Sequence, residues 1–586
     1  MIKLTADFET TTDENDCRVW AWAVCEIGNV DNFSYGNDIK TFLNYLYDLK
    51  RSKLWFHNLK FDGEFLVQAL YSLGYQHVDD IEHATDKSFT TLISNMGAWY
   101  TIDIFLEVDE NKKIRRRATI YDSLKIFNFS VDAIAKDFDL PINKLTLDYT
   151  TMRPVGHELT PHEIDYIRND VEIMARALHI MFEQGHTKIT IGSDALAYYK
   201  KITKNFRKIY PELPPEVDKD IRQSYKGGFT YLSPKWQDKL VNGGITIDIN
   251  SAYPAVLHNY LLPYDQPIRF EGAYQQDDEY PLYVIMFTCS FELKPEKIPS
   301  IQLKRNPFFK SNEYIASSNG RTIHLCLTKP DYELFREQYK VNNLEFIGGY
   351  KFRGAVGMFT DYVDYWIAEK IKNKKAGNKA QTLISKLFLN SLYGKFSLNV
   401  NSGTKVPIMV DGTLRYKYIK PDDKRKPVYL PIGTFTTAYQ RKYIIETSQK
   451  IRDWSMAERG YDAYIYSDTD SCHLKLSPND VPELAKFLKI DDYELGAWAL
   501  ECQWKRGKFL RQKCYLEETM TDEIVCTVAG LPKQYAPLLT FDNFKIGMST
   551  EDLDKHKMQE LGIKPKLSYK HVKGGVVLQP TEFTIK

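Results

Sequence analysis

A short acidic turn between two strand-like segments constrains the fold of this chain most. Residues 463–466 are aromatic and β-branched, and residues 472–476 alternate apolar and polar, with Asp468, Thr469 and Asp470 between them. Such flanks predict a β-hairpin that presents two carboxylates at its turn. Carboxylates held this close repel each other unless a cation lies between them, and Mg²⁺ prefers oxygen ligands. Most such turns are solvated loops, so a metal site also requires a third carboxylate and a phosphate-binding element elsewhere in the chain.

The length of 586 residues is too great for one hydrophobic core and predicts two to four domains. No run of about 18 apolar residues occurs, which predicts no membrane span. Residues 1–7 enter a strand pattern directly, which predicts no signal peptide. The 8 cysteines form no C-x-x-C pair, which argues against a zinc ribbon and favours a reduced, intracellular compartment.

Alternating strand and helix patterns predict an α/β domain over residues 1–190, followed by a Lys- and Pro-rich linker at 203–215. Strand patterns dominate residues 265–355, a long helical stretch is predicted over 360–393, and a basic β-hairpin over 400–430. The absence of G-x-x-x-x-G-K-[ST] argues against a P-loop helicase or ATPase.

The net charge of +1 does not by itself indicate a nucleic-acid-binding protein, but basic residues cluster. Residues 112–117, 370–379 and 505–513 are basic runs, which are most often solvated faces. The last run includes or adjoins aromatic residues, as a surface that follows phosphates would. These aromatic residues are Trp504, Phe509 and Tyr515.

Three acids near the N-terminus lie in or beside strand patterns. Asp7 and Glu9 are two positions apart in the strand 4–10, so their side chains point to the same side and can share a metal ion. Asp62 follows the apolar strand 54–56 and is expected in a glycine-bounded turn.

A fourth acid lies in a helix whose start can be read from the sequence. Thr160 as N-cap, Pro161 at the first helical position and Glu163 at the third form a capping box. Tyr166 and Asp170 follow four residues apart and therefore share one helix face. Four acids and a tyrosine on three elements are suited to two-metal hydrolysis of a phosphodiester, with the metal ions about 3.5–4 Å apart.

The second acidic set begins with Asp248, near the end of the strand 245–250, which we expect Pro254 to stop. A rigid strand end could hold this carboxylate beside the turn that carries Asp468 and Asp470. Tyr253 follows, where its ring could form the floor of a nucleotide site, although core packing is an equal alternative.

A phosphate-binding element is predicted in the helix 379–394. Four polar residues fall within about 60° of one another on its surface, and Gly394 stands where the residue after a helix end would. A face with this order of Lys, Asn and Tyr could follow a nucleotide from triphosphate to base. The four residues are Lys379, Lys386, Asn390 and Tyr393.

Two further motifs are weak when taken alone. Lys513 and Tyr515 could hold a primer backbone, and the glycines of Tyr225-Lys226-Gly227-Gly228 permit close backbone approach to a strand.

Together these segments resemble the family B DNA polymerases, specifically the protein-primed replicative polymerases of small linear-genome Bacillus phages of the Salasmaviridae type. The resemblance runs from end to end and includes the closing residues 583–586. It implies an α/β and α+β multidomain fold, with an RNase H-like 3′–5′ exonuclease domain before a right-hand polymerase domain that carries two insertions. The implied boundaries are 1–190 for the exonuclease, 191–260 for the linker and first palm part, 261–358 for insertion 1, 359–397 for the fingers, 398–428 for insertion 2, 429–530 for the remaining palm and 531–586 for the thumb.

For the exonuclease, the resemblance implies metal-binding acids and a catalytic tyrosine, Tyr166. It implies that Lys144 supports this site and that five neighbours hold the single-stranded 3′ end or the priming protein. The acids are Asp7, Glu9, Asp62 and Asp170, and the five neighbours are His57, Asn58, Phe61, Ser123 and Leu124.

For synthesis, the resemblance implies that Asp248 and Asp470 bind both metal ions and that Asp468 tunes them. Tyr253 would stack under the incoming sugar and exclude ribose. The implied dNTP ligands are Lys374, Lys386, Asn390 and Tyr393, and the implied DNA-binding residues are Lys513, Tyr515, Tyr225, Gly227 and Gly228.

The resemblance implies two Mg²⁺ ions per active site, with Mn²⁺ as a substitute. The implied partners are primer and template DNA, dNTPs, a terminal protein docked by insertion 1 and a viral single-stranded DNA-binding protein, with strand displacement assigned to insertion 2. It also implies a monomer in the cytoplasm of the infected bacterium. The alternatives are a non-synthetic DNA clamp or packaging protein and a DNA-primed repair polymerase, the latter disfavoured by the short chain. Ala252 and Lys226 depart from the family pattern, where bulkier residues and Arg are common.

Overall fold

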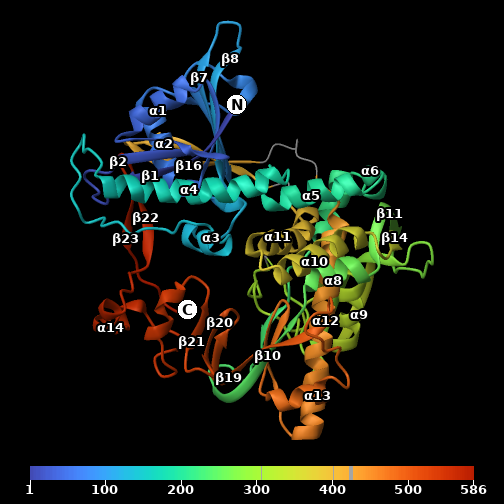
Figure 1. Ribbon diagram of the computed structural model, residues 1–586. Helices are drawn as coiled ribbons and strands as arrows, with labels where there is room; N and C mark the ends of the chain where they lie inside the picture. The colour runs from blue at the N-terminus through green and yellow to red at the C-terminus, as the bar shows by residue number, and fades with distance from the viewer. Residues whose placement is uncertain (305, 400–401, 421–426) are drawn as a thin grey trace.

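The computed structural model in Figure 1 describes residues 1–304, 306–399, 402–420 and 427–586. The N-terminal part is built on a sheet whose described strands run in the order β16-β15-β6-β7-β8-β4-β1-β2-β3, with β5 paired to β6. The central strands β1, β4 and β8 are parallel. The bounds of all described strands in this sheet are β1 Ile2–Thr10, β2 Val19–Glu26, β3 Asn29–Gly36, β4 Arg51–Phe56, β5 Gln76–His77, β6 Ser88–Ser94, β7 Trp99–Val108, β8 Ile114–Asp122, β15 Thr404–Val410 and β16 Thr413–Ile419.

The last two strands of this sheet come from far along the chain. β15 and β16 form the hairpin expected within 400–430, and β15 pairs with β6 through Thr404 and Ser94. The predicted insertion 398–428 therefore extends the N-terminal sheet, although residues 400–401 and 421–426 of it lie outside the described residues. The helices packed around this sheet are α1 Ile39–Asp48, α2 Leu59–Ser72, α3 Val131–Asp137 and α4 Pro161–Glu183.

A second sheet carries the acidic turn, with the described strands in the order β21-β20-β19-β10-β18-β17-β9. The predicted hairpin is confirmed as β17 and β18, and the predicted strand before Asn250 is confirmed as β10. The bounds are β9 Thr230–Leu232, β10 Leu240–Ile249, β17 Tyr464–Asp468, β18 Ser471–Leu474, β19 Trp498–Arg511, β20 Cys514–Thr519 and β21 Ile524–Val528, with α8 Ala252–Asn259, α12 Leu430–Arg459 and α13 Val481–Leu484 packed nearby.

A third sheet, in the order β11-β14-β12-β13, confirms the prediction that strands dominate residues 265–355. A helix within this region, α9, was not predicted. The bounds are β11 Leu262–Glu271, β12 Leu282–Leu293, β13 Ile323–Thr328, α9 Lys329–Gln338 and β14 Tyr339–Ala355.

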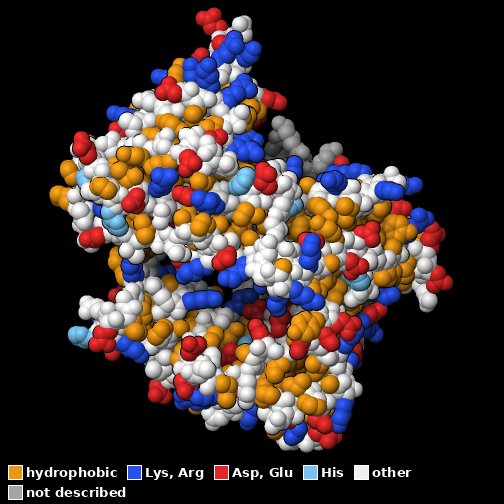
Figure 2. All heavy atoms as spheres, in the orientation of Figure 1, with side chains coloured by type: hydrophobic (Ala, Val, Ile, Leu, Met, Phe, Trp, Pro, Cys, Tyr) orange, Lys and Arg blue, Asp and Glu red, His pale blue; other side chains and the backbone are white. Residues whose placement is uncertain are grey.

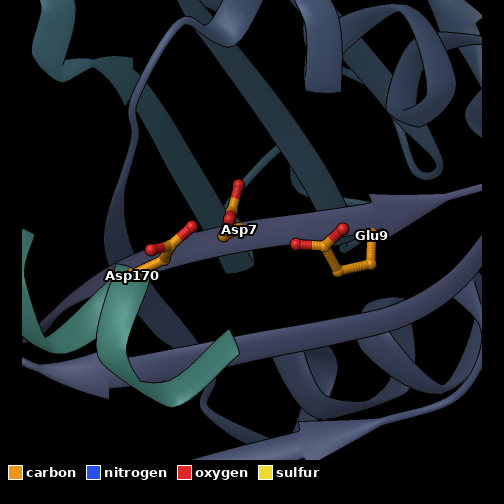
Figure 3. A group of neighbouring side chains, drawn as sticks. All are labelled: Asp7, Glu9 and Asp170. Carbon is orange, nitrogen blue, oxygen red and sulfur yellow. The ribbon is translucent and has the colours of Figure 1, made fainter. Parts of the chain in front are cut away.

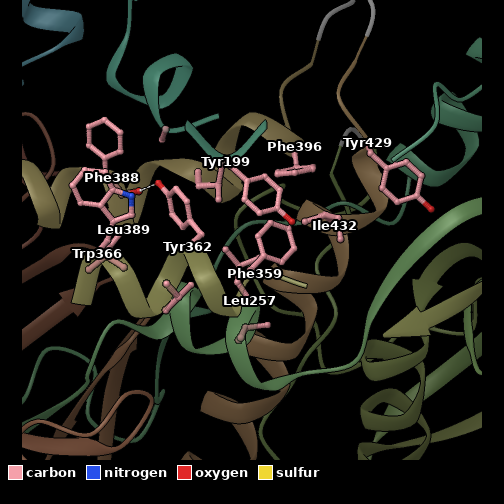
Figure 4. Packing of buried hydrophobic residues seen from close by; sticks show 14 of the residues in the cluster. Tyr199, Leu257, Phe359, Tyr362, Trp366, Phe388, Leu389, Phe396, Tyr429 and Ile432 are labelled. Atoms are coloured by element: carbon pink, nitrogen blue, oxygen red, sulfur yellow. Dashed lines mark hydrogen bonds between the residues drawn. The ribbon is translucent and has the colours of Figure 1, made fainter. Parts of the chain in front are cut away.

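Helices connect these sheets through an aromatic core (Figure 4). Tyr199 of α5 stacks on Phe359 with 4.6 Å between ring centroids, and Trp366 of α10 stacks on Phe388 of α11 at 4.2 Å. The Tyr362 hydroxyl donates to the Phe388 carbonyl at 2.8 Å. This packing fixes the helix pair above the second sheet. The bounds are α5 Ile191–Ile202, α6 Phe206–Ile209, α7 Pro215–Arg222, α10 Thr360–Lys375 and α11 Lys379–Phe396.

Two helix predictions and one strand-end prediction were wrong in detail. The stretch 360–393 is two helices, because Gly377 takes a φ of +71° between them. Gly394 lies inside α11, which continues because Leu392 and Phe396 are fully buried. Pro254 does not end the strand, since β10 stops at Ile249, but lies in the first turn of α8, where its missing N–H costs nothing.

Two loop predictions were also wrong. The expected linker at 203–215 contains α6 and packs Phe206, Tyr210 and Leu213 into the core, because its aromatic side chains outweigh its Lys and Pro content. Asp62 was expected in a turn but lies in the first turn of α2, buried.

The C-terminal part contains α14 Lys555–Glu560 and the hairpin of β22 Leu567–Val572 and β23 Gly575–Pro580. In Figure 1 this hairpin lies on the left side of the view and rises from the C-terminal part at the lower left toward the N-terminal sheet. Figure 2 shows a hollow across the middle of this face, with Lys and Arg side chains gathered along it. None of the helices in the described ranges combines the length and apolarity that crossing a bilayer demands.

Two candidate active sites

The N-terminal acids converge as the strand and helix patterns predict (Figure 3). One carboxylate oxygen from each of Asp7, Glu9 and Asp170 lies within 4.8 Å of the others. α4 begins with the predicted capping box at Thr160. The Thr5 hydroxyl of β1 donates to the Val171 carbonyl of α4 at 2.6 Å, which fixes the helix that carries Asp170 on the strand that carries Asp7.

Burial and mutual repulsion dominate the electrostatics of this site. Burial first and the Asp170 charge second raise the pKa of Asp7 to about 7. Burial likewise raises the pKa values of Glu9 and Asp62, with the Asp7 charge as a further cause. Oxygen Oδ1 of Asp62 and of Asp170 is buried without a hydrogen-bond partner. A buried acidic cluster with orphaned oxygens has the donor set that a divalent cation takes.

Lys144 partly offsets this negative charge. Its ammonium lies 2.5 Å from Asp170 Oδ2. Burial raises the pKa of Asp170, and Lys144 opposes that rise.

Tyr166 lies in the same cavity as the acids, together with a residue that the sequence reading missed. The Tyr149 hydroxyl lies 3.0 Å from the Tyr166 hydroxyl and also hydrogen-bonds to Glu9. No local sequence pattern marks Tyr149, because it lies in a segment without regular structure.

The cavity at this site has a volume of about 490 Å³. His57, Asn58 and Phe61 line it, as do Asp62 and Lys144. Ser123 and Leu124 lie outside its lining. Ser123 is fully buried, and its hydroxyl lies 3.1 Å from His57 Nδ1. Ser123 therefore influences the cavity only through the orientation of the His57 ring.

The second site forms where β10 ends beside the β17–β18 turn. Asp248 pairs in register with Ser471, and the Ile249 amide donates to the Asp470 carbonyl at 2.9 Å. Thr469 has a φ of +63°, and its amide donates to the Phe229 carbonyl at 2.7 Å. This tight turn holds Asp470 next to Asp248.

Asp248 and Asp470 both carry raised pKa values. Burial, then Asp470 and Glu501, raises the pKa of Asp248 to about 7. Burial and, less strongly, Asp468 and Glu501 raise the pKa of Asp470 to about 6. Glu501 on β19 is an acid that the sequence reading missed, because only the pairing of β19 with β10 brings it here.

Asp468 has a different environment from Asp470. Its carboxylate accepts from Lys513 Nζ at 3.0 and 3.1 Å and from the Tyr466 hydroxyl at 3.1 Å. Thr230 adds a longer hydrogen bond at 3.3 Å. Asp468 is therefore already satisfied by protein groups, which supports the predicted division between the two acids of the turn.

The helix residues predicted to bind a nucleotide line a cavity of about 490 Å³ with both acids. Lys386, Asn390 and Tyr393 of α11 are among its lining residues, and the Tyr253 and Tyr393 rings stack at 4.1 Å. The predicted Lys374 lines two neighbouring cavities instead. Lys379 lines one of these.

Lys370 of α10 also lines the cavity of Asp248 and Asp470, and the sequence reading missed it. Burial, then Lys386 and Lys374, lowers the pKa of Lys370. Three lysines that repel one another beside two acids have the charges that a triphosphate with bound metal ions would balance.

The Tyr225–Gly228 segment packs against the acidic turn. A Cβ on Gly228 would lie 2.6 Å from the Thr469 hydroxyl, so a larger residue would displace the turn. Arg441 of α12 donates to the carbonyls of Lys226 and Gly227 at 2.7 and 2.8 Å and pairs with Asp331 at 2.7 Å. This buried ion pair fixes the glycine segment.

One prediction about the basic run 505–513 was wrong. Trp504 and Phe509 are buried, with 1% and 0% of their surface exposed, because both pack into one hydrophobic cluster with Ile465 and Tyr466 of β17. They form core and cannot stack on nucleic acid, whereas Tyr515 is partly exposed.

Two separated carboxylate sites, one beside a lysine-lined nucleotide-sized cavity, agree with the class of protein that the family comparison identifies. Residues 44–481 match the family model described as DNA polymerase type B, organellar and viral, and the chain belongs to this family.

Within that family the chain is a protein-primed replicative DNA polymerase of the group that includes the Bacillus phage phi29 enzyme. It is 43% identical to the DNA polymerase of Bacillus phage M2 over 99% of both chains. It is 40% identical to that of Bacillus phage phi29, over 99% of this chain and 98% of the relative. The solved structure of phi29 DNA polymerase complexed with primer-template DNA and incoming nucleotide substrates matches over 100% of both chains, with a TM-score of 0.90 and 38% identity. The predicted mixed α/β multidomain architecture is thereby confirmed at this level.

Proposed function

We propose that this polymerase copies phage DNA at the Asp248–Asp470 site and removes 3′ nucleotides at the Asp7–Asp170 site. The observation that carries the proposal is the presence of two separate acidic cavities with different surroundings. One adjoins lysines and stacked tyrosines, and the other adjoins Tyr166 and Lys144. Two sites with such different neighbours are suited to two reactions.

Synthesis requires that a 3′-hydroxyl, or the hydroxyl of a priming protein, attacks the α-phosphate of a dNTP. Asp248 and Asp470 would hold two Mg²⁺ ions, or Mn²⁺ in their place, whose charge activates the hydroxyl and stabilises the leaving pyrophosphate. Lys370, Lys374 and Lys386 neutralise the triphosphate.

The other residues of this site position the substrates. Tyr253 and Tyr393 separate to admit the sugar and base, and the Tyr253 ring excludes a ribose hydroxyl. Asn390 contacts the nucleotide along the same helix face. Lys513, Tyr515 and the Tyr225–Gly228 segment hold the primer and template.

Hydrolysis at the N-terminal site follows the same electrostatic logic. Asp7, Glu9, Asp62 and Asp170 would hold a second pair of Mg²⁺ ions, whose charge would lower the pKa of the attacking water and stabilise the departing 3′ oxygen. Tyr166 orients the attacking water, Tyr149 holds Tyr166 in place, and Lys144 keeps Asp170 ionised.

We assign parts of the chain to the family's domains on this basis. The N-terminal sheet with residues 1–190 is an RNase H-like 3′–5′ exonuclease domain. Residues 191–260 are the linker and the first part of the palm, which contains the second sheet, and 429–530 are the rest of the palm. Residues 359–397 are fingers and 531–586 a thumb. Residues 261–358 dock the terminal protein, and 398–428 surround the DNA and support strand displacement.

The partners follow from the relatives. Solved structures of phi29 DNA polymerase contain primer-template DNA, incoming nucleotides or single-stranded DNA. We infer that this chain binds the same ligands and also a terminal protein and a viral single-stranded DNA-binding protein, as a monomer in the cytoplasm of the infected host.

Formation of a covalent adduct tests protein priming. The purified chain, its phage's terminal protein and labelled dNTPs are incubated with Mg²⁺, and proteins are resolved under denaturing conditions. We expect label on the terminal protein, dependent on Asp470. Robust extension of DNA primers without any labelled protein would instead favour a DNA-primed repair polymerase.

A further inference from the structure

The C-terminal hairpin forms one wall of the N-terminal acidic cavity, although hundreds of residues separate them in sequence. Lys564, Leu567 and Tyr569 line this cavity together with Asp7 and Asp62. Figure 1 shows β22 and β23 reaching the sheet next to β1 and β2.

The hairpin is firmly seated rather than loosely adjacent. Val576 is 1% exposed and belongs to the hydrophobic core under Phe65 of α2. A Cβ on Gly574, which has a φ of +100°, would lie 1.9 Å from the Cys17 carbonyl oxygen. A Cβ on Gly575 would lie 2.4 Å from the Phe65 ring. Only glycine permits this approach.

An ion pair and a second polar contact add to the contacts between the hairpin and the N-terminal part. Lys570 pairs with Glu14 beyond the end of β1, and His571 lies 3.5 Å from Glu64 of α2. The two residues that follow Tyr569 thus contact both the segment after β1 and helix α2.

Tyr569 faces the cavity with a partly exposed ring. Its hydroxyl hydrogen-bonds to the Asn58 side chain, and its ring centroid lies 6.1 Å from that of Phe61. Lys60 Nζ lies 5.0 Å from the Tyr569 centroid. Two aromatic rings that line the cavity of the four acids therefore stand together, with the Lys60 cation over one of them.

Proteins bind single-stranded nucleic acid by stacking bases on aromatic rings beside basic groups that follow the backbone. We propose that Tyr569 is a base-stacking residue for the single-stranded 3′ end, so that the C-terminal hairpin completes the exonuclease site. Phe61 provides the neighbouring apolar surface, and Lys60 and Lys564 face the phosphates. This inference rests on the proposed exonuclease function of the Asp7 site.

Single-turnover degradation of a 5′-labelled oligothymidylate, measured over a range of enzyme concentrations, tests the inference. Tyr569→Ala should raise the half-saturating concentration about tenfold, the loss expected for one stacked base. The rate at saturation should not change, because the acids are untouched. Tyr569→Phe should stay within about twofold of the parent, because it keeps the ring. Tyr35→Ala, at a 46% exposed tyrosine of β3, is the matched control and should have no effect.

A crosslinking measurement supplies a second readout in the Asp7→Ala, Glu9→Ala background. An oligonucleotide with 5-iodouracil near its 3′ end should crosslink on irradiation to the peptide that contains Tyr569. Unchanged affinity in Tyr569→Ala, or equal losses in the Ala and Phe variants, would overturn the stacking role.

Failure of the inference and failure of the proposed function give different results. If the exonuclease assignment is wrong, Asp7→Ala with Glu9→Ala still degrades single strands. If only the inference is wrong, that double variant is inactive while Tyr569→Ala binds and degrades single strands like the parent.

Discussion

The ammonium of Lys513 lies 3.0 Å from a carboxylate oxygen of Asp468, two residues before Asp470 in the same turn. Lys513 therefore neutralises one acid of the turn and leaves the other available for metal ions.

This relationship predicts unequal effects of the same substitution. Asp470→Asn should lower the rate of primer extension about a thousandfold or more, because a metal ligand is lost. Asp468→Asn should lower the extension rate only about 10–100-fold, as is typical of a residue that positions a metal ligand without binding the metal ion itself. Steady-state extension of a primed template measures both, and equal losses would contradict the division of roles.

The position of Lys370 predicts a specific kinetic effect. Lys370→Ala should raise KM for dNTPs about tenfold, the loss of one charge-assisted contact, with a smaller change in kcat. Lys372→Ala is the matched control, since that residue lies on the same helix with a 72% exposed side chain. Single-nucleotide incorporation kinetics distinguish the two, and an effect as large in Lys372→Ala would rule out a specific role.

The raised pKa values predict pH-dependent metal binding. Burial raises the pKa of Asp7 to about 7 in the metal-free folded state. Between pH values of about 4 and 7 the folded state therefore holds a proton on Asp7 that the unfolded state has lost, so the free energy of unfolding falls as pH rises through this range. A bound metal ion displaces that proton, and affinity should fall about tenfold per pH unit below 7 for each proton displaced.

The measurement is the increase in melting temperature caused by Mg²⁺ at pH 8 and at pH 6. We expect a larger increase at pH 8, and Asp7→Asn should reduce the difference. A larger increase at pH 6 would have the wrong sign for this explanation.

The Arg441–Asp331 pair predicts a stability effect. Both side chains are at least 90% buried, so Asp331→Ala leaves a buried charge and should destabilise the fold by about 3–5 kcal/mol. Replacing both residues with Leu should cost less than Asp331→Ala alone. Urea unfolding followed by tryptophan fluorescence compares them, and a double variant as unstable as the single would show that the charge is not the cause.

Local signals allowed much of both sites to be predicted. The capping box at Thr160 fixed the start of α4 and the face that carries Asp170, and strand alternation placed Asp7 beside Glu9. The flanks of Asp468 and Asp470 were sufficient to predict the hairpin. Each of these depends on neighbours a few residues apart.

What could not be predicted depends on tertiary contacts. Gly394 looked like a helix end, but burial of Phe396 extends α11 past it. Glu501 and Lys370 come to the second site only through strand pairing and helix packing, and Tyr149 comes to the first through its hydrogen bond to Tyr166.

Reciprocal loss of the two activities tests the central claim most directly. Asp470→Ala and the double variant Asp7→Ala, Glu9→Ala are each assayed for extension of a primed template and for degradation of a 3′ overhang without dNTPs. The account predicts that Asp470→Ala loses synthesis but degrades the overhang at the parent rate, whereas the double variant does the reverse. Loss of both activities in either variant, or retention of synthesis by Asp470→Ala, would contradict two separate sites.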